Sequence, residues 1–191
     1  MNATPAVLIR RGTPADAPAL AVFAPRTFAE AFGPDNRPED LRAHLEASFG
    51  VEQQLRELCD PRLVTLLAHQ GDALLGFAQV RPIAPPAGLH LEHPVELQRF
   101  YVDRPAHGTG VAQLLMRAAR EAAVQFGGRH LWLGVWERNA RAIAFYAKAG
   151  FVDVGSKDFF VGSDRQTDRV LVARLEGHRD NVAERATAPR R

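Results

Sequence analysis

Apolar residues recur at two different spacings along the first sixty positions, and the two spacings predict one strand followed by helices. A short apolar stretch at 6–11 predicts the strand. A helix is expected over about 14–32, and Pro25 should break or bend it, because proline lacks the amide proton that a helix interior needs. Leucine and phenylalanine at helical spacing over 38–58 predict two further short helices, separated at Gly50.

The rest of the chain alternates between strand and helix patterns. Strands are expected at 63–69, 73–82, 95–103, 130–136, 151–162 and 167–175, and helices at 110–126 and 139–149. The first two of these strands form a hairpin, and a proline-rich loop at 82–94 follows them. The strands at 95–103 and 130–136 are joined through a helix, so they should be parallel with a right-handed crossover. These patterns predict an α/β fold with a mixed sheet of about seven strands.

Length and composition predict one domain. The chain has 191 residues, which favours a single domain over two, expected here over 1–176. Residues 177–191 are polar and end in ATAPRR, so they are expected to form a frayed tail. The sequence contains no apolar run long enough to span a membrane, and the apolar stretch near its start is too short for a secretory signal. The expected location is therefore the cytoplasm.

Charge and cysteine content exclude several classes of function. The first hundred residues carry a net negative charge and the remainder a net positive one, so the two halves could suit ligands of opposite sign. Basic residues do not cluster with aromatic ones, so nucleic-acid binding is not expected. Cys59 is the single cysteine, which excludes an intrachain disulfide and a multi-cysteine metal site, and no metal is expected. It also lacks a nearby His/Asp pattern, which disfavours an acyl-cysteine route.

A glycine-containing loop precedes the helix expected at 110–126. In the segment HGTGVA (107–112), glycines allow successive amides to converge on one point, and the helix start adds partial positive charge, which suits a phosphate. A P-loop would need Lys after the second glycine, where Val111 stands, and a dinucleotide fingerprint would need glycine where Gln113 stands. ATP, GTP and NAD are thus disfavoured. Taken alone, the loop could also be a turn that binds nothing.

The surroundings of this loop resemble a known family. The loop is similar to the pyrophosphate loop of the GNAT acetyltransferases, Arg/Gln-x-x-Gly-x-Gly/Ala, with His107 replacing the usual first residue. Residues 139–151 resemble the second GNAT motif, N-x-x-A-x-x-x-Y-x-x-x-G-F. Over about 7–175, segments such as VELQRFYVD and FFVG resemble the PaiA-type polyamine acetyltransferases within GNAT. The resemblance implies a GNAT fold, with helices on both faces of the sheet and a splayed pair formed by the strands at 95–103 and 130–136.

The resemblance also implies a donor site for acetyl-CoA as co-substrate. The backbone at Phe100, Tyr101 and Val102 should pair with the pantetheine arm, and Asn139 is a cofactor contact or a helix N-cap. Lys148 is a possible phosphate contact or simply an exposed lysine. The residues expected at the cofactor are Phe100, Tyr101, Val102, His107, Gly108, Thr109, Gly110, Val111, Ala112, Gln113, Asn139, Tyr146 and Lys148.

Two residues are expected to carry the chemistry of acetyl transfer to an amine. Tyr146 falls on the GNAT tyrosine that protonates the leaving thiolate, and Glu96 lies where related enzymes carry a catalytic glutamate. The alternatives are a packed aromatic side chain for Tyr146, and for Glu96 an exposed strand residue or a group that only attracts the cation. Glu30 and Glu96 are the carboxylates expected beside the acceptor, in a region rich in acidic residues that could attract a polyamine.

The resulting hypothesis is an N-acetyltransferase that moves an acetyl group from acetyl-CoA to a primary amine by direct attack in a ternary complex. Spermidine or spermine is the first acceptor class. Three alternatives stay open: a peptide, protein or other small-amine acceptor, including an amine antibiotic; a CoA-sensing module without turnover; and a nucleotide-binding protein. GNAT proteins often dimerise, so a homodimer is a further expectation.

Overall fold

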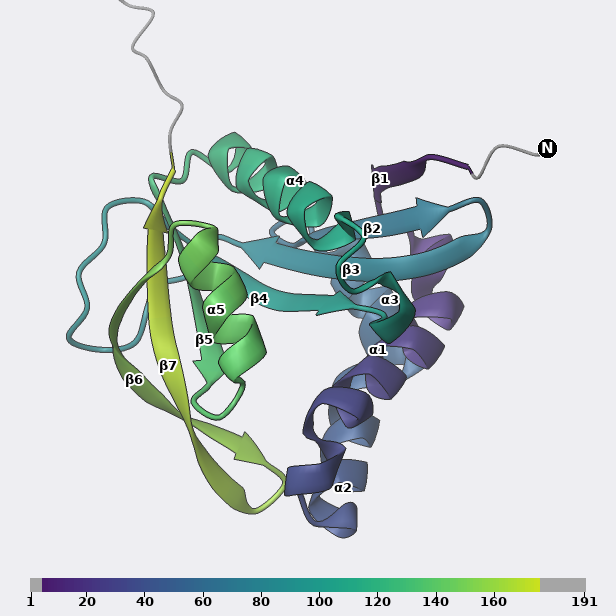
Figure 1. The fold of residues 1–191 in the computed structure, drawn as a ribbon, viewed down its shortest axis with the longest axis horizontal. Coiled ribbons are helices and arrows are strands. Elements are labelled where there is room, and N and C mark those ends of the chain that lie inside the picture. The colour runs from purple at the N-terminus through teal and green to yellow at the C-terminus, as the bar shows by residue number, and fades with distance from the viewer. Residues whose placement is uncertain (1–4, 176–191) are drawn as a thin grey trace, which may run out of the picture.

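The computed structural model describes residues 5–175, and the expected tail at 177–191 lies outside them. Its elements in chain order are β1 (Val7–Arg11), α1 (Ala17–Phe32), α2 (Pro38–Phe49), α3 (Val51–Cys59), β2 (Val64–Gln70), β3 (Ala73–Arg81), β4 (Pro94–Val102), α4 (Val111–Gln125), β5 (His130–Trp136), α5 (Ala140–Lys148), β6 (Val152–Val161) and β7 (Asp164–Arg174) (Figure 1). Short 3-10 turns at 14–16, 33–35 and 104–106 link some of them.

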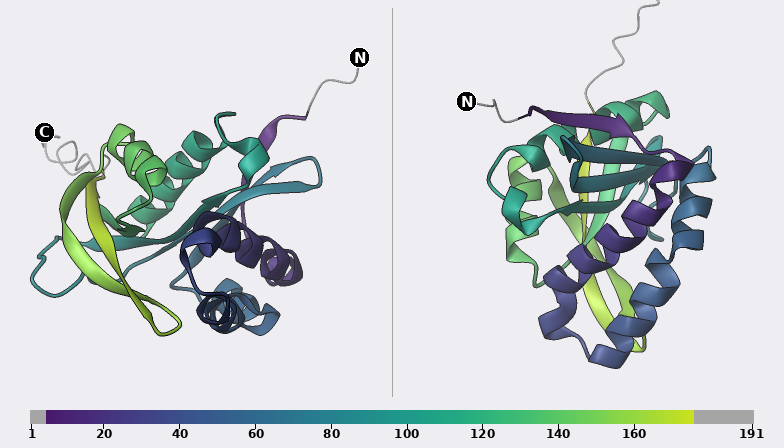
Figure 2. Two further views of the ribbon diagram at one scale, coloured as in Figure 1. Left: turned by 60° about the horizontal axis from the view of Figure 1, so that its bottom comes forward. Right: turned by 90° about the vertical axis from the view of Figure 1, so that its right-hand side faces the viewer.

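The strands form one mixed sheet in the order β1-β2-β3-β4-β5-β7-β6. The β4–β5 pair is parallel and the other pairs are antiparallel, as the crossover through α4 requires. Helices cover both faces: α4 and α5 lie on one side, and α1, α2 and α3 on the other (Figure 2). These findings confirm the predicted α/β sheet of seven strands.

Each face of the sheet has its own apolar core. On one face, the inward residues of β2 to β5 and β7 pack on α4 and α5, with Leu115 and Leu131 fully buried. On the other face, α1 and α2 pack on Phe77 and Leu67 of the hairpin formed by β2 and β3. Alternation along each strand divides the side chains between the two cores, because successive residues point to opposite faces.

Two details differ from the sequence-based expectation. Helix α1 is not interrupted at Pro25, because buried residues on both sides of the proline, including Phe23 and Phe28, anchor it to the sheet. That burial outweighs the one hydrogen bond that proline removes. Strand β7 begins at Asp164 rather than at 167, since a tight turn at Gly162 and Ser163 lets pairing continue to the end of the hairpin.

The tip of the β6–β7 hairpin is tied to α2. The Asp40 carboxylate accepts hydrogen bonds from the amide and the hydroxyl of Ser163, at 2.8 and 3.0 Å. In Figure 1 the hairpin reaches across the lower part of the molecule to α2. This contact joins two segments more than a hundred residues apart and closes one end of the space between α2 and the sheet.

Candidate active site

The centre of the sheet is split between β4 and β5. Their pairing is limited to Pro94–Glu96 with His130–Trp132, although both strands continue beyond it. The cause lies in β4, where Leu97 is opposite Val80 and Arg99 is opposite Gln79, so Gln98 is an extra residue. Such a bulge bends the strand that carries it. The two strands therefore diverge, which confirms the splayed pair that the family resemblance implies.

The glycine loop lies where β4 ends and α4 begins. Gly108 and Gly110 have φ values of 79° and 92°, a left-handed region that glycine enters without strain. Gly110 is the residue that caps α4, and the first-turn amides of a helix have no preceding carbonyl to donate to. A Cβ on either glycine would meet no atom within 4 Å, so the space beside the loop is open. Backbone conformation, rather than crowding, requires glycine here.

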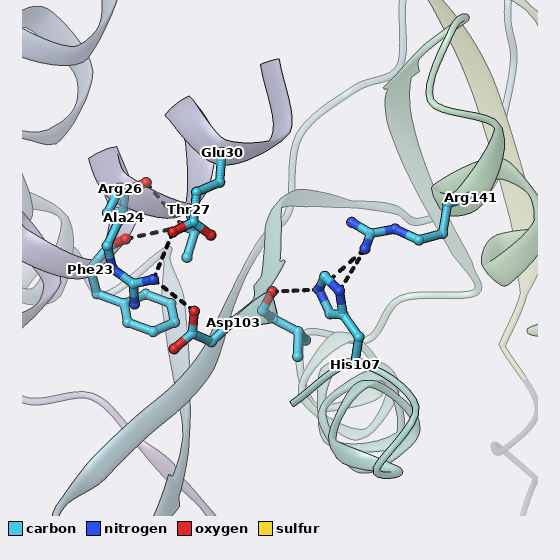
Figure 3. A network of polar contacts seen from close by, with 9 residues as sticks. Phe23, Ala24, Arg26, Thr27, Glu30, Asp103, His107 and Arg141 are labelled. Atoms are coloured by element: carbon cyan, nitrogen blue, oxygen red, sulfur yellow. Dashed lines mark hydrogen bonds and ion pairs between the residues drawn. The ribbon is translucent and has the colours of Figure 1, made fainter. Parts of the chain in front are cut away.

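His107 connects this loop to its neighbours (Figure 3). Its Nε2 lies 2.9 Å from the Val102 carbonyl, and its Nδ1 lies 2.6 Å from a guanidinium nitrogen of Arg141 on α5. Because arginine can only donate, Nδ1 must accept, and the ring proton belongs on Nε2, which donates to Val102. Arg141 is a cation at the loop that the sequence did not single out. It is 34 residues away in the chain, and only the packing of α5 brings it close.

Helix α5 carries the second motif. The Asn139 side chain accepts a hydrogen bond from the Ala142 amide at 3.1 Å, so it acts as the N-cap, and it also lines the site cavity. Tyr146 is 7% exposed and packs edge-on against Phe100 and Phe151, and burial raises the pKa of its phenol. Lys148 is exposed at the end of the helix and does not line that cavity.

A cavity of about 700 Å³ passes through the split in the sheet. Most of the residues expected at the site contribute to its lining: Glu30, Glu96, Phe100, Tyr101, Val102, His107, Gly108, Ala112, Gln113, Asn139 and Tyr146. Three expected loop residues are not in the lining. The Thr109 hydroxyl donates to the Ala106 carbonyl at 2.8 Å, Gly110 caps the helix, and Val111 is buried in the core beneath it. Cys59 is exposed and is not part of the lining.

Strand alternation places several polar groups of this cavity on the face covered by α1 and α2. Glu96 is opposite Trp132 in the β4–β5 pair, and Asp168 is opposite Trp136 in the β5–β7 pair, so both share a face with Gly134. Burial raises the pKa of Glu96, although the positive charges of Lys157 and Arg81 oppose that shift.

Asp168 and Lys157 were not identified from the sequence. They are cross-strand partners on β6 and β7, and both line the cavity. Burial raises the pKa of the Asp168 carboxyl to about 6, against the opposing positive charge of Lys157. If the turn of the last hairpin had been located at Gly162 from the sequence, the alternation of side chains along its two strands would have placed Asp168 and Lys157 on one face.

The other acidic residues near the acceptor side are largely engaged elsewhere. Glu30 pairs with Arg26 at 3.0 Å, and Arg26 also bonds Asp103 at 2.7 Å, which joins α1 to the end of β4 (Figure 3). Glu57 pairs with Arg99 at 2.6 Å, and both side chains are largely buried. Of the acidic residues in the first hundred positions, Glu30 and Glu96 are the two that line the cavity.

Aromatic rings form much of the wall on the same side. His44 stacks on Phe28 with ring centres 4.7 Å apart, and Phe49 and Phe159 lie next to it. Burial and the nearby Arg99 lower the pKa of His44, so it is neutral at neutral pH. This part of the cavity can therefore hold the apolar portion of a ligand, while the carboxylates hold a cation.

Two negative findings apply to residues 5–175. No helix in that range is long and apolar enough to cross a membrane. Nor do three or more His, Cys, Asp or Glu side chains in that range come together in a way that could hold a metal ion.

Comparison with known proteins identifies the family. The family model for the acetyltransferase (GNAT) family matches residues 26–151. The chain is a member of the GNAT family. An uncharacterised N-acetyltransferase of Mycobacterium tuberculosis (strain ATCC 25618 / H37Rv) is 34% identical over 160 residues, which cover 84% of this GNAT chain and 98% of the relative. The activity class is accordingly acetyl transfer from acetyl-CoA to nitrogen.

Two further similarities inform the search for a substrate. The streptothricin acetyltransferase of Streptomyces lavendulae is 33% identical over 146 residues, covering 76% of this GNAT chain and 63% of that protein. The crystal structure of a PaiA N-acetyltransferase from Thermoplasma acidophilum, solved with coenzyme A, superposes with a TM-score of 0.73. It is 19% identical and covers 88% of this chain and 99% of that one. At this identity the second similarity shows the shared GNAT fold.

Proposed function

We propose that this GNAT protein acetylates a small primary amine, in the first place a polyamine such as spermidine or spermine, by direct attack in a ternary complex. The observation that carries the proposal is one cavity that passes through the split sheet. It is lined by the glycine loop and Tyr146 on the α4/α5 side and by Glu96 on the α1/α2 side. Donor and acceptor would enter from opposite faces and meet between β4 and β5.

The residues of the α4/α5 side fit coenzyme A. The amides of Gly108 and Gly110 and of the first turn of α4 would hold the pyrophosphate, because they lie at the positive end of a helix and, unlike those of His107 and Thr109, the two glycine amides donate to no backbone carbonyl among the described residues. The open space beside both glycines leaves room for it. Arg141 adds a cation beside His107. The β4 backbone at 100–102 would pair with the pantetheine arm, since β5 has left that edge free. When bound, acetyl-CoA supplies the thioester.

Tyr146 would act as the acid. Its raised pKa keeps the phenol protonated at neutral pH, so a proton is available for the thiolate sulfur as the carbon–sulfur bond breaks. Its ring is fixed by Phe100 and Phe151, which holds the hydroxyl in a defined position.

Glu96 would act as the base, directly or through a water molecule. An alkylammonium with a pKa near ~10 is almost fully protonated at neutral pH, so one proton must leave before the nitrogen can attack. The raised pKa of Glu96 brings the carboxylate closer to the pKa of that donor. Glu30 is a weaker candidate for the acceptor side, because its carboxylate is already ion-paired with Arg26.

The aromatic wall and the carboxylates together favour an acceptor with an aliphatic chain and at least one ammonium group. The sequence resemblance to the PaiA-type polyamine acetyltransferases favours a polyamine, and the relative named streptothricin acetyltransferase favours an amine antibiotic as the second candidate. Thiol release from acetyl-CoA, measured with spermidine, spermine, streptothricin and lysine peptides, separates these possibilities. A preference for streptothricin or a peptide over both polyamines would replace the first proposal.

A variant of Tyr146 tests the mechanism. Tyr146→Phe keeps the ring that packs on Phe100 and Phe151, so coenzyme A affinity by calorimetry should stay within about 3-fold of wild type. Turnover should fall by about 100-fold or more, the usual contribution of a general acid. Unchanged turnover would remove Tyr146 from the mechanism.

If wild-type protein binds the coenzyme but releases no thiol with any amine, the protein is a CoA-sensing module instead. Light scattering on the same samples tests the expected homodimer.

A further inference from the structure

Asp168 is a buried carboxylate without a hydrogen-bond donor. It is 6% exposed, yet it lines the site cavity. Within residues 5–175, no side chain or backbone amide hydrogen-bonds or ion-pairs with it. A buried ionisable group normally has a partner, because an unpaired buried charge is costly. Its free oxygens therefore face the cavity, where a ligand can reach them.

The backbone beneath this carboxylate is adapted to it. Gly134 is on β5, and a Cβ there would lie 2.8 Å from an Asp168 oxygen and 2.5 Å from the Cε of Lys157. Any larger residue would displace both side chains. Lys157 stands beside the carboxylate, but its ammonium lies over the ring of Trp132, 5.3 Å from the ring centre, and it is not in ion-pair contact with Asp168 in the described part of the chain.

The charges around the cavity do not balance. Glu30 is ion-paired with Arg26, which also binds Asp103, and Glu57 is ion-paired with Arg99; Glu96 and Asp168 are carboxylates on this face without an ion pair in the described residues. The groups that act on the Asp168 charge are Lys157 from β6 and the buried phenol of Tyr101 from β4, and the same Lys157 also acts on Glu96. Arg81 acts on Glu96 in addition, whereas Lys157 is the one cation that acts on Asp168 within residues 5–175. A cation that entered the cavity would give the Asp168 carboxylate an ion-pair partner.

We infer that Asp168 binds the ammonium group of the acceptor and so sets the preference of this enzyme for cationic amines. This inference rests on the proposed function. Glu96 keeps the proton-accepting role, whereas Asp168 fixes the position of the cation above Gly134. In an acceptor with several ammonium groups, Asp168 holds one while another is deprotonated by Glu96. Lys157 is a positioning residue, since its charge keeps the carboxylate ionised without occupying its oxygens.

The ionisation of Asp168 gives this recognition a pH limit. With a pKa of about 6, the carboxylate is charged at neutral pH and becomes protonated in mild acid. The acceptor amine stays cationic across that range, so its affinity should fall as the pH drops through about 6, while coenzyme A affinity should not follow the same curve.

The test measures binding and turnover separately. Spermidine is titrated calorimetrically into protein saturated with coenzyme A, and steady-state kinetics with acetyl-CoA follow, for wild type and Asp168→Asn. The variant should weaken spermidine binding by about 30-fold or more, as expected for a lost buried charge contact. The KM for spermidine should rise in parallel, while kcat and the KM for acetyl-CoA change by less than about 3-fold. Asp168→Glu, which keeps the charge, should recover part of the affinity.

Asp158→Asn is the matched control. Asp158 lies on the same hairpin but is exposed and pairs with Arg165 at 2.9 Å, so its loss should change neither constant. If Asp168→Asn binds spermidine as wild type does, or loses kcat at constant KM, the inference is wrong although the proposed function stands. If wild type binds coenzyme A but neither binds nor acetylates any amine, the proposed function fails as well. Should Asp168→Asn fail to fold, Gly134→Ala, which displaces the same carboxylate, must reproduce the loss of affinity.

Discussion

The unpaired carboxylate of Asp168 should cost the folded protein stability, and removing its charge should recover it. Burial raises its pKa from 3.8 to about 6. At about 1.4 kcal/mol for each pKa unit, a carboxylate that is fully ionised in both states lowers the free energy of unfolding by about 3 kcal/mol. Asp168→Asn carries no charge to bury and should be more stable than wild type by up to that amount at about pH 8.

The sign follows from the two protonation equilibria. The folded state binds the proton more tightly than the unfolded chain, so the stabilising contribution of the protonated form is present below about pH 4 and is lost as the pH rises toward about 6. The difference between variant and wild type should therefore be near zero at about pH 4 and reach its full value above about pH 7. Other carboxylates also titrate in this range, but they cancel in the difference.

Thermal denaturation across this pH range is the assay. For a domain of this size, a stabilisation of about 3 kcal/mol raises Tm by about 6–12 °C. Asp158→Asn should follow the wild-type curve, because that side chain is exposed. A lower Tm for Asp168→Asn at high pH, or a difference that does not vary with pH, would mean that the carboxylate has a stabilising partner, and the reasoning would be refuted.

Three further substitutions test the elements that hold the site. Gly110→Ala places a side chain at a φ of 92°, so it should lose about 1–2 kcal/mol of stability and weaken coenzyme A binding; equal Tm and affinity would show that the turn does not need glycine. Arg99→Leu leaves the buried Glu57 charge unpaired and should cost about 3–5 kcal/mol in urea denaturation, whereas a loss below about 1 kcal/mol would contradict the buried ion pair. Asp40→Ala should speed hydrogen exchange of the Ser163 amide by about 10-fold or more, and an unchanged rate would show that another group holds the hairpin.

Much of the fold could be predicted from the chain because local pattern and topology agree there. The crossover from 95–103 to 130–136 permits only a parallel pair, and the glycine loop was recognisable because few other residues enter a left-handed turn. The interruption expected as one outcome at Pro25 is absent, because the burial of Phe23 and Phe28 is a tertiary effect that no local rule contains.

The acceptor side of the site was harder to predict than the donor side. Asp168 meets Lys157 only when the register of the last hairpin is known, and on the donor side the one missed side chain, Arg141, reaches His107 only through the packing of α5. With that strand expected to begin at 167 instead of Asp164, the register could not be read. The donor side depends mainly on backbone geometry, and the glycines that this geometry requires form a recognisable sequence motif. The acceptor side depends on side chains from distant strands, which form no such motif.

The bulge at Gln98 makes the length of β4 as important as its composition. Deleting this one residue would make Leu97 and Arg99 neighbours opposite Val80 and Gln79, so every other side chain would keep its face, but the bend in the strand would be lost. An unbent β4 would no longer diverge from β5 after Glu96, and the split between the two strands would close. Among homologous sequences, gaps should therefore be rare between the strand start and the glycine loop, even where the side chains differ widely.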